Sequence, residues 1–143
     1  MANRLCDALF VYLLRSHLTA RAGDAAASWL RGLDDPQIRA ALTLMHERPE
    51  HAWSVAALAA GVGMSRAAFA ARFTALVGQT PIRYLTQWRM QKAATLLRTE
   101  RRSIESIARH VGYESPVAFA KTFKRVTGRP PGAYRRRAEA AAG

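Results

Sequence analysis

Cationic side chains that could bind a phosphate or the edge of a base recur along residues 116–127. If this segment is a helix, Val117, Lys121 and Lys124 lie on one face, because positions four and seven residues on point in nearly the same direction. A lysine donates hydrogen bonds to guanine acceptors or phosphates, whereas a valine offers only apolar contact, for example to a thymine methyl. We predict that this face binds a nucleic-acid groove, with Arg125 beside it and Ser115 at its start.

A second set of candidates lies fifty residues earlier, on residues 66–77. Ala67, Ala71 and Thr74 take the same three positions there, and their short side chains make this segment the poorer direct reader of bases. Arg66 and Thr74 are its best polar candidates, and Arg72 lies nearer the flank, where we expect a phosphate contact. The N–H groups around the serine that starts each segment are natural phosphate sites. The predicted DNA-binding residues of this segment are Ser65, Arg66, Ala67, Ala70, Ala71, Arg72 and Thr74.

The two segments belong to an internal repeat. Residues 117–134, VAFAKTFKRVTGRPPGAY, match residues 67–84, AAFAARFTALVGQTPIRY, at seven of eighteen aligned positions. The helical spacing predicts a core stripe of Phe69, Phe73 and Leu76 in the first copy and of Phe119, Phe123 and Val126 in the second. This stripe lies opposite the candidate binding face. The repeated phenylalanines are therefore interpreted as core residues and not as stacking platforms.

Helix start and stop signals predict an all-α fold, in which each copy is a short helix, a glycine turn and a second helix. Such a unit is a helix-turn-helix. The offset between the copies is 49 as far as Gly63 and Gly112 and 50 from the second helix onward, so the turn contains a one-residue insertion. We expect helices at about 4–17, from 36 to just before Pro49, and at 55–61, 66–77, 81–98, 104–111 and 116–127, with N-caps at Asp35, Ser54, Ser65, Ser103 and Ser115.

The charge of the chain lies almost entirely in the region of the repeat. Residues 66–137 hold sixteen of the 22 basic residues and three of the ten acidic ones, a net charge of +13, whereas residues 1–65 are neutral overall. A surface of one sign repels itself, and it attracts a polyanion. We therefore expect nucleic acid as the partner.

Other classes of function find little support. The single cysteine, Cys6, cannot form an internal disulfide, which suits a reducing cytoplasm, and it lacks a basic neighbourhood that would activate it. The four histidines show no metal-ligand spacing, so we expect no metal or other cofactor. The apolar run at residues 5–14 is too short to span a membrane. We expect a cytoplasmic protein that is not an enzyme.

The stretches SRAAFAARFTALVGQTPIRYLTQWRMQKAATLLR and SIESIARHVGYESPVAFAKTFKRVTGRPPGAYRR closely resemble the DNA-binding domain of AraC/XylS-type bacterial transcription regulators. The resemblance covers about residues 36–137. It implies that 66–77 and 116–127 are recognition helices, which enter successive major-groove segments on one face of bent double-stranded promoter DNA. It also implies that the helix at 81–98 holds them apart, and that RNA polymerase is a further partner.

Members of that family also carry a sensor and dimerisation domain, often a cupin-type β-barrel, ahead of the DNA-binding half. Here RLCDALFVYLLRSHL looks like the closing helix of such a domain, which indicates either a truncated product or a short member that pairs through residues 5–18. We predict four segments. They are an N-terminal helical segment at 1–34, a first helix-turn-helix with its linker helix at 35–98, a second helix-turn-helix at 99–137, and a tail at 138–143.

The sequence thus predicts a sequence-specific DNA-binding transcription regulator of the AraC type. An alternative is a protein-interaction or dimerisation module that acts through its N-terminal apolar helix and has only non-specific affinity for DNA. An operator, an effector and the sign of regulation do not follow from the residues.

Overall fold

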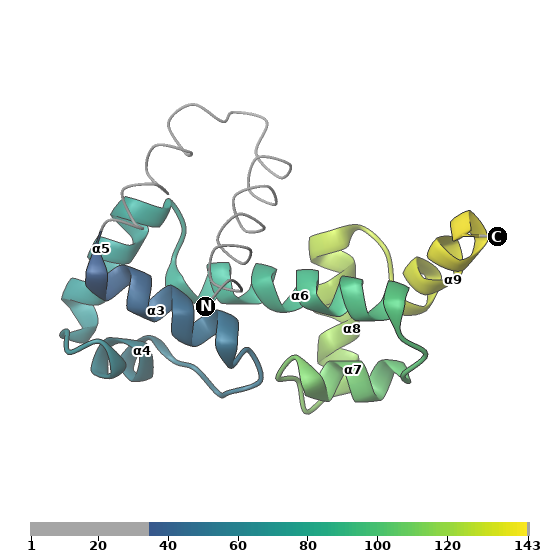
Figure 1. Cartoon of the computed structure of the whole chain (residues 1–143), viewed down its shortest axis with the longest axis horizontal. Helices are drawn as coiled ribbons and strands as arrows, with labels where there is room; N and C mark the ends of the chain where they lie inside the picture. The colour runs from purple at the N-terminus through teal and green to yellow at the C-terminus, as the bar shows by residue number, and fades with distance from the viewer. Residues whose placement is uncertain (1–34, 143) are drawn as a thin grey trace. The chain divides into compact units, whose positions relative to one another are not determined.

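The computed structural model describes residues 35–142 of the chain (Figure 1). All regular secondary structure in this range is helical, with no strand among the described residues, so the all-α prediction is confirmed. The predicted helix at 4–17 lies outside the described residues. None of the helices seen here is long and apolar enough to cross a membrane.

Seven helices follow one another along the described residues. The last helix continues through residues 138–142, which we predicted as part of a tail, because alanine and glutamate favour the helix. In chain order the seven helices are α3 (Pro36–Glu47), α4 (Val55–Gly61), α5 (Arg66–Val77), α6 (Pro81–Thr99), α7 (Ile104–His110), α8 (Pro116–Thr127) and α9 (Pro131–Ala142).

Five of these helices begin at an aspartate or serine whose side chain accepts backbone hydrogen bonds. Asp35 Oδ1 accepts from the N–H groups of Gln37 at 3.0 Å and Ile38 at 3.2 Å. Each capping serine accepts from the N–H three residues on, at 3.0 to 3.2 Å. The first turn of a helix has no internal acceptor for these N–H groups, so a cap contributes about 1 kcal/mol. The predicted caps at Asp35, Ser54, Ser65, Ser103 and Ser115 are confirmed.

Contacts divide the described residues into two units. The first contains residues 35–48 and 53–85, and the second contains residues 49–52 and 86–142. The division falls inside α6, after Leu85, whereas we predicted it after residue 98. The reason is that four residues of α6, Met90, Ala93, Ala94 and Leu97, are buried in the core of the second unit.

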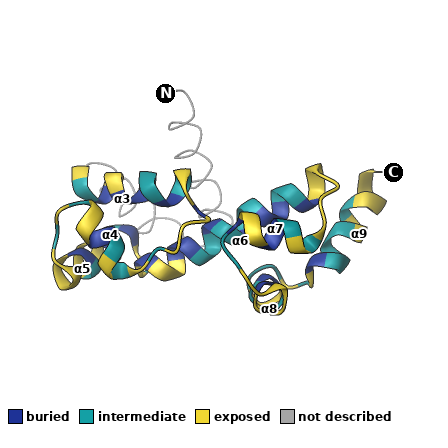
Figure 2. Ribbon diagram, turned by 90° about the horizontal axis from the view of Figure 1, so that it is seen from below, coloured by how far each residue is buried: buried dark blue, intermediate teal, exposed yellow. Residues whose placement is uncertain are grey.

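The core of the first unit consists of buried residues of α3, α4 and α5 and of the start of α6 (Figure 2). Phe69 and Phe73 are fully buried with ring centroids 5.7 Å apart, and the Tyr84 ring stands edge-on to Phe73 at 5.8 Å. Val77 is also fully buried, whereas Leu76, which we predicted in the core stripe, is only partly buried. Residues four apart drift by about 40° around a helix, so the stripe turns toward Val77.

The core of the second unit repeats this arrangement on α8. Phe119 and Phe123 are fully buried with centroids 5.7 Å apart, and the Tyr134 ring stands edge-on to Phe123 at 5.3 Å. Val126 packs against this core and is partly buried. The core assignment of the repeated phenylalanines is therefore confirmed in both copies.

Each unit also contains an equivalent first helix, which residue identity alone does not reveal. After the last buried position of this helix comes a polar residue, His46 or Arg98, with a side-chain nitrogen 2.8 Å from the hydroxyl oxygen of Tyr84 or Tyr134. The buried positions have the same spacing in both helices, namely Ile38, Ala41, Leu42 and Met45 in α3 and Met90, Ala93, Ala94 and Leu97 in α6.

The turn between the two helices of each helix-turn-helix depends on glycine. Gly63 and Gly112 have φ of 72° and 96°, in the left-handed region that side chains disfavour. In both units the next residue, Met64 or Tyr113, donates its N–H to a carbonyl five residues earlier, at 2.9 and 2.8 Å. The equivalent capping serine follows directly in the first unit but one residue later in the second. The predicted insertion therefore lies in the turn and is Glu114, which is exposed.

Candidate nucleic-acid interface

Most of the predicted binding residues lie on the sides of α5 and α8 that face away from the phenylalanine cores, whereas Ala70 and Arg72 lie between that side and the core. Eleven of the twelve are exposed, and Ala70 is partly buried. Contact of these residues with DNA stays a prediction. They are Ser65, Arg66, Ala67, Ala70, Ala71, Arg72 and Thr74 on or before α5, and Ser115, Val117, Lys121, Lys124 and Arg125 on or before α8.

The outer face of α8 presents two unpaired cations and one apolar side chain. Lys121 and Lys124 are exposed, and no other described residue forms a hydrogen bond or ion pair with their ammonium groups. Val117, one helical turn before Lys121, is 64% exposed, although a large apolar side chain normally lies inside a protein. This face can donate hydrogen bonds at two positions and make apolar contact at a third.

The outer face of α5 is chemically different. Ala67 and Ala71 are exposed methyl groups. Thr74 donates its hydroxyl hydrogen to the carbonyl oxygen of Ala70 at 2.7 Å, so its methyl group and one lone pair remain available. Between Ala67 and Thr74 this face therefore has no free hydrogen-bond donor. Arg66, at the start of α5, is exposed and has no partner among the described residues.

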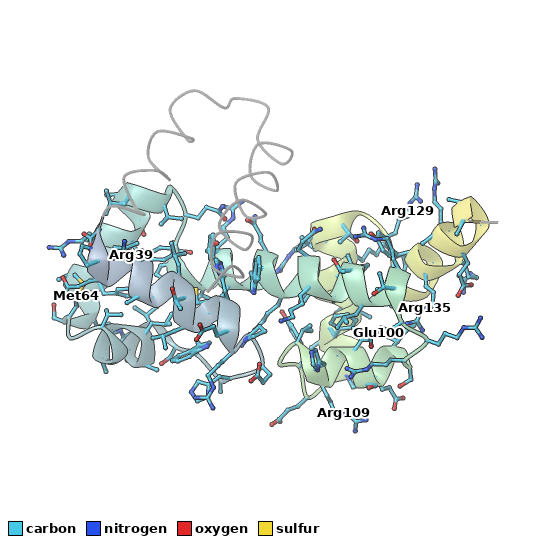
Figure 3. The ribbon with its side chains drawn as sticks, viewed as in Figure 1. Arg39, Met64, Glu100, Arg109, Arg129 and Arg135 are labelled. Carbon is cyan, nitrogen blue, oxygen red and sulfur yellow. The ribbon has the colours of Figure 1, made fainter. Side chains whose placement is uncertain are left out.

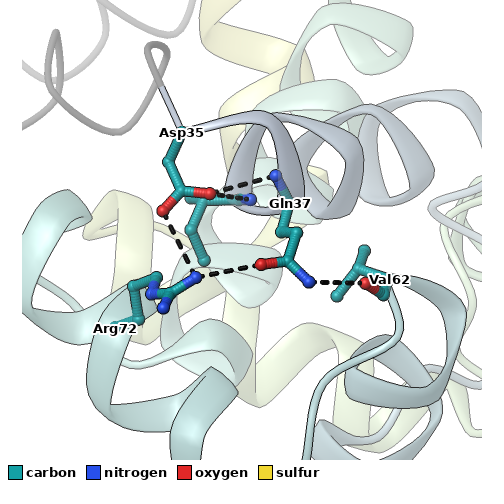
Figure 4. Close-up of polar contacts among 5 residues, drawn as sticks. Asp35, Gln37, Val62 and Arg72 are labelled. Carbon is teal, nitrogen blue, oxygen red and sulfur yellow. Dashed lines mark hydrogen bonds and ion pairs between the residues drawn. The ribbon is translucent and has the colours of Figure 1, made fainter.

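Arg72 is the one predicted contact whose charged group is engaged by another residue in the described range 35–142 (Figure 4). Its Nη1 donates to Gln37 Oε1 at 3.0 Å and lies 3.6 Å from Asp35 Oδ2. Gln37 in turn donates from Nε2 to the carbonyl oxygen of Val62, in the helix-turn-helix turn, at 3.0 Å. These four residues join α5 to the start of α3 and to the turn. We call them the Arg72 network.

The first turns of α5 and α8 also differ in their free N–H groups. The serine cap occupies the N–H of the third helical residue in both, at 3.2 Å. In α5 the N–H groups of Arg66 and Ala67 remain. Because α8 begins with Pro116, which has no N–H, only Val117 remains there. A phosphate would therefore find more backbone donors at α5, where the cationic side chains are fewer.

Several arginines of the second unit also have partners within the protein, among them Arg135, which Figure 3 labels. Arg98 donates to the Tyr134 hydroxyl at 2.8 Å, and Arg102 forms an ion pair with Glu100 at 2.9 Å. Arg135 of α9 donates to the carbonyl oxygens of Leu97 at 3.3 Å and Glu100 at 3.2 Å, and so satisfies acceptors at the end of α6. A count of basic residues treats these groups as equal to the exposed lysines, so the sequence carried no signal for their structural roles.

Arg89 is a partly buried cation of this unit. It donates from Nε to the carbonyl oxygen of Pro49 and from Nη2 to that of His51, both at 2.8 Å, and its guanidinium lies 5.9 Å from the ring centroid of Tyr113. Burial lowers the pKa of Arg89 below its ordinary value, and the nearby Tyr113 and Glu50 oppose this shift in part. The two carbonyl bonds hold residues 49–52 to the second unit.

Comparison with known proteins identifies the fold family. A family of helix-turn-helix domains matches residues 58–137, more than half of the chain. A Streptomyces antibioticus protein described as an AraC-like transcription regulator is 46% identical over 95% of this chain, and the HTH-type transcriptional regulator AlkR of Acinetobacter baylyi is 39% identical over 93%. The chain spans 45% and 43% of the lengths of these two relatives.

A solved structure shows the same arrangement of helices. The DNA-binding domain of the transcriptional factor AdpA, in complex with a target DNA, is 34% identical, and the match has a TM-score of 0.69. It covers 75% of this chain and 96% of that domain. Together with the two helix-turn-helix units described above, these matches place the chain in the family of AraC-type helix-turn-helix proteins.

Proposed function

We propose that the chain is the DNA-binding part of a bacterial transcription regulator, and that α5 and α8 bind successive major-groove segments of promoter DNA. The observation that carries the proposal is the duplicated helix-turn-helix, in which both cores contain the same buried phenylalanine pair and edge-on tyrosine while the outer faces of the second helices stay exposed. A major groove admits one α-helix, and the second helix of a helix-turn-helix is the one that enters it. The AdpA domain, which has the same fold, was solved on a target DNA.

In the major-groove segment bound by the second unit, the residues proposed to contact bases lie on α8. Lys121 and Lys124 donate to guanine O6 and N7 or to a phosphate, and Val117 contacts a thymine methyl. Arg125 and the N-terminus capped by Ser115 bind phosphate oxygens. The support is the exposure of these side chains and the absence of any partner for the two lysines among the described residues.

In the segment bound by the first unit, α5 makes mostly apolar contacts. Ala67, Ala70, Ala71 and the Thr74 methyl approach the groove floor, and Arg66 is the cationic group available for a base edge or a phosphate. Short side chains allow the helix backbone to approach the bases closely. The capped end at Ser65 binds a phosphate oxygen through backbone N–H groups.

Selection of duplexes from a random library by the whole chain tests this function. We expect a selected sequence with two elements separated by about one helical turn of DNA, since tandem readers meet the groove once per turn. Affinity should fall about a thousandfold between roughly 50 and 200 mM salt if about six phosphates are neutralised. A chain that enriches no sequence, at any salt concentration, is not a specific regulator.

Two further partners are proposed. Contact with RNA polymerase follows from the regulators to which the chain is similar, and bacterial promoter DNA would place its action in the cytoplasm. Pairing of two copies through residues 5–18 follows from the apolar sequence there, outside the described residues. Sedimentation equilibrium over a hundredfold range of concentration tests the pairing, and a constant monomer mass would exclude it. The function assigned is binding rather than catalysis.

A further inference from the structure

We propose that Arg72 is a positioning residue, which fixes α5 against α3 and the helix-turn-helix turn and does not contact DNA. The inference rests on the proposed function, because it concerns how α5 is presented to a groove. It changes the role that the charge pattern predicted for this residue, namely a phosphate contact at the flank of the recognition helix.

The Arg72 side chain does not point in the direction of the outer face of α5. On a helix of 3.6 residues per turn, Arg72 lies roughly 130° around the axis from the centre of the face formed by Ala67, Ala71 and Thr74. It therefore leaves α5 between the buried stripe and the outer face, on the side where α3 begins. Figure 4 shows its guanidinium directed at Asp35 and Gln37.

Both partners of Arg72 are themselves fixed. Asp35 uses Oδ1 to cap α3, at 3.0 Å and 3.2 Å from two backbone nitrogens, and Oδ2 faces Arg72 at 3.6 Å. Gln37 accepts from Arg72 at 3.0 Å and donates to Val62 at 3.0 Å, so both ends of its amide are used. A phosphate that took Arg72 would leave the Gln37 oxygen and one Asp35 oxygen without their partner.

The second unit provides a contrast. The position equivalent to Arg72 is Thr122, a half-buried neutral residue, so that unit folds around its recognition helix without such a cation. The position equivalent to Gln37 is Arg89, which also reaches toward its own turn, because its guanidinium carbon lies 3.2 Å from the site of a Cβ on Gly112. In each unit a polar residue of the first helix contacts the turn. In the first unit this residue, Gln37, also accepts a hydrogen bond from Arg72 of α5.

Three variants isolate the network from the charge itself. Asp35→Asn removes the negative charge and keeps the cap, because asparagine caps a helix as well as aspartate does. Arg72→Met removes the cation and keeps most of the apolar stem. Arg66→Met is the matched control, since it removes an exposed arginine from the same helix that has no partner among the described residues.

The measurement is the affinity of the whole chain for its selected duplex and for a scrambled duplex, as a function of salt. We expect Arg72→Met and Asp35→Asn each to weaken binding to the selected duplex by about threefold to tenfold, and the double variant to weaken it no further. Asp35→Asn raises the net charge, so electrostatics alone predicts tighter binding. The slope of log K against log salt should stay unchanged for both, whereas Arg66→Met should reduce it by about 0.9.

Two results would overturn the inference. One is a salt slope for Arg72→Met reduced as much as for Arg66→Met, which would make Arg72 a phosphate contact. The other is tighter binding by Asp35→Asn with a steeper slope, which would mean that Asp35 withholds Arg72 from DNA. Failure of the wild-type chain to distinguish the two duplexes would instead remove the proposed function. In that case a double-mutant cycle of Asp35→Asn and Arg72→Met, measured by thermal stability, still tests whether the two residues of the Arg72 network are coupled. Additive effects of the two substitutions would exclude such coupling.

Discussion

The two helix-turn-helix units share the buried phenylalanine pair of their second helix and differ on its exposed surface. Phe69 and Phe73 have the same burial and ring separation as Phe119 and Phe123. Outside, α5 presents methyl groups, whereas α8 presents an exposed valine and two lysines that no other described residue pairs with. Core packing constrains the shape and volume of buried side chains, so most substitutions in a duplicated core lower stability. Exposed positions tolerate substitution more easily.

The difference also concerns where the cations are used. In the first unit Arg72 of α5 is joined to Asp35 and Gln37. In the second unit the arginines that bind within the protein lie outside α8, and no residue that the structure describes pairs with the lysines of α8. The comparison predicts that the second unit supplies most direct hydrogen bonds to bases. The first unit is expected to contribute close approach of the helix to the groove and apolar contacts.

The largest expected effect tests the shared core. Phe73→Ala and Phe123→Ala should each lower the free energy of unfolding by about 3 to 5 kcal/mol, because both remove a fully buried ring. Chemical denaturation followed by circular dichroism measures the loss. Strongly unequal losses would show that the two cores are not energetically equivalent.

Lys121→Ala should cost about 1 to 3 kcal/mol of binding to the selected duplex and relax preference at one base pair, if the lysine reads a base. Thr74→Ala, on α5, should cost less, because the hydroxyl hydrogen is already bound to Ala70. Competition binding with single-base variants of the duplex measures both. A uniform loss over all sequences would make Lys121 a phosphate contact.

The turn glycines provide a smaller contrast in stability. A Cβ on Gly63 meets nothing within 4 Å, so Gly63→Ala pays only for its positive φ, about 1 kcal/mol. A Cβ on Gly112 lies 3.0 Å from the Pro49 carbonyl oxygen, tighter than ordinary contact, so Gly112→Ala should cost about 1 kcal/mol more. Thermal unfolding of both variants measures the difference, and equal losses would contradict a tight approach of residue 49.

The smallest expected effect concerns single methyl groups. Replacing one thymine by deoxyuridine in the selected duplex removes only the C5 methyl, which is worth about 0.8 kcal/mol when fully buried. We expect a loss of up to this size at one thymine beside Val117, and no loss there in the Val117→Ala variant. Substitutions without effect on the wild-type chain would remove the apolar role of Val117.

Much of the fold could be predicted because its signals are local. A serine or aspartate before a helix and a glycine after it act within four residues, so the caps and turns were predicted at the positions where they occur. The repeat itself located both recognition helices. The equivalence of α3 and α6 could not be read in this way, because their buried positions share spacing but few residue types.

The roles of the arginines could not be predicted, because they depend on partners far along the chain. Asp35 was predicted as a cap, but its second oxygen meets Arg72, and this pairing leaves no periodic pattern in the sequence. Arg89 and Arg135 likewise bind carbonyl groups that any residue possesses. Which cations remain available to DNA is therefore a property of the folded chain, although the excess charge is visible in the composition.

The division of α6 between the units limits how such a protein can be recombined. Its first residues carry Tyr84 of the first unit, and its later residues provide the first helix of the second. A crossover placed just before α6 strips one unit of its tyrosine, and one placed just after α6 strips the other of a packing helix. Exchange of a single helix-turn-helix unit between relatives thus requires a breakpoint near residue 85, inside a continuous helix. Hybrid proteins joined in the loops on either side of α6 should fold poorly.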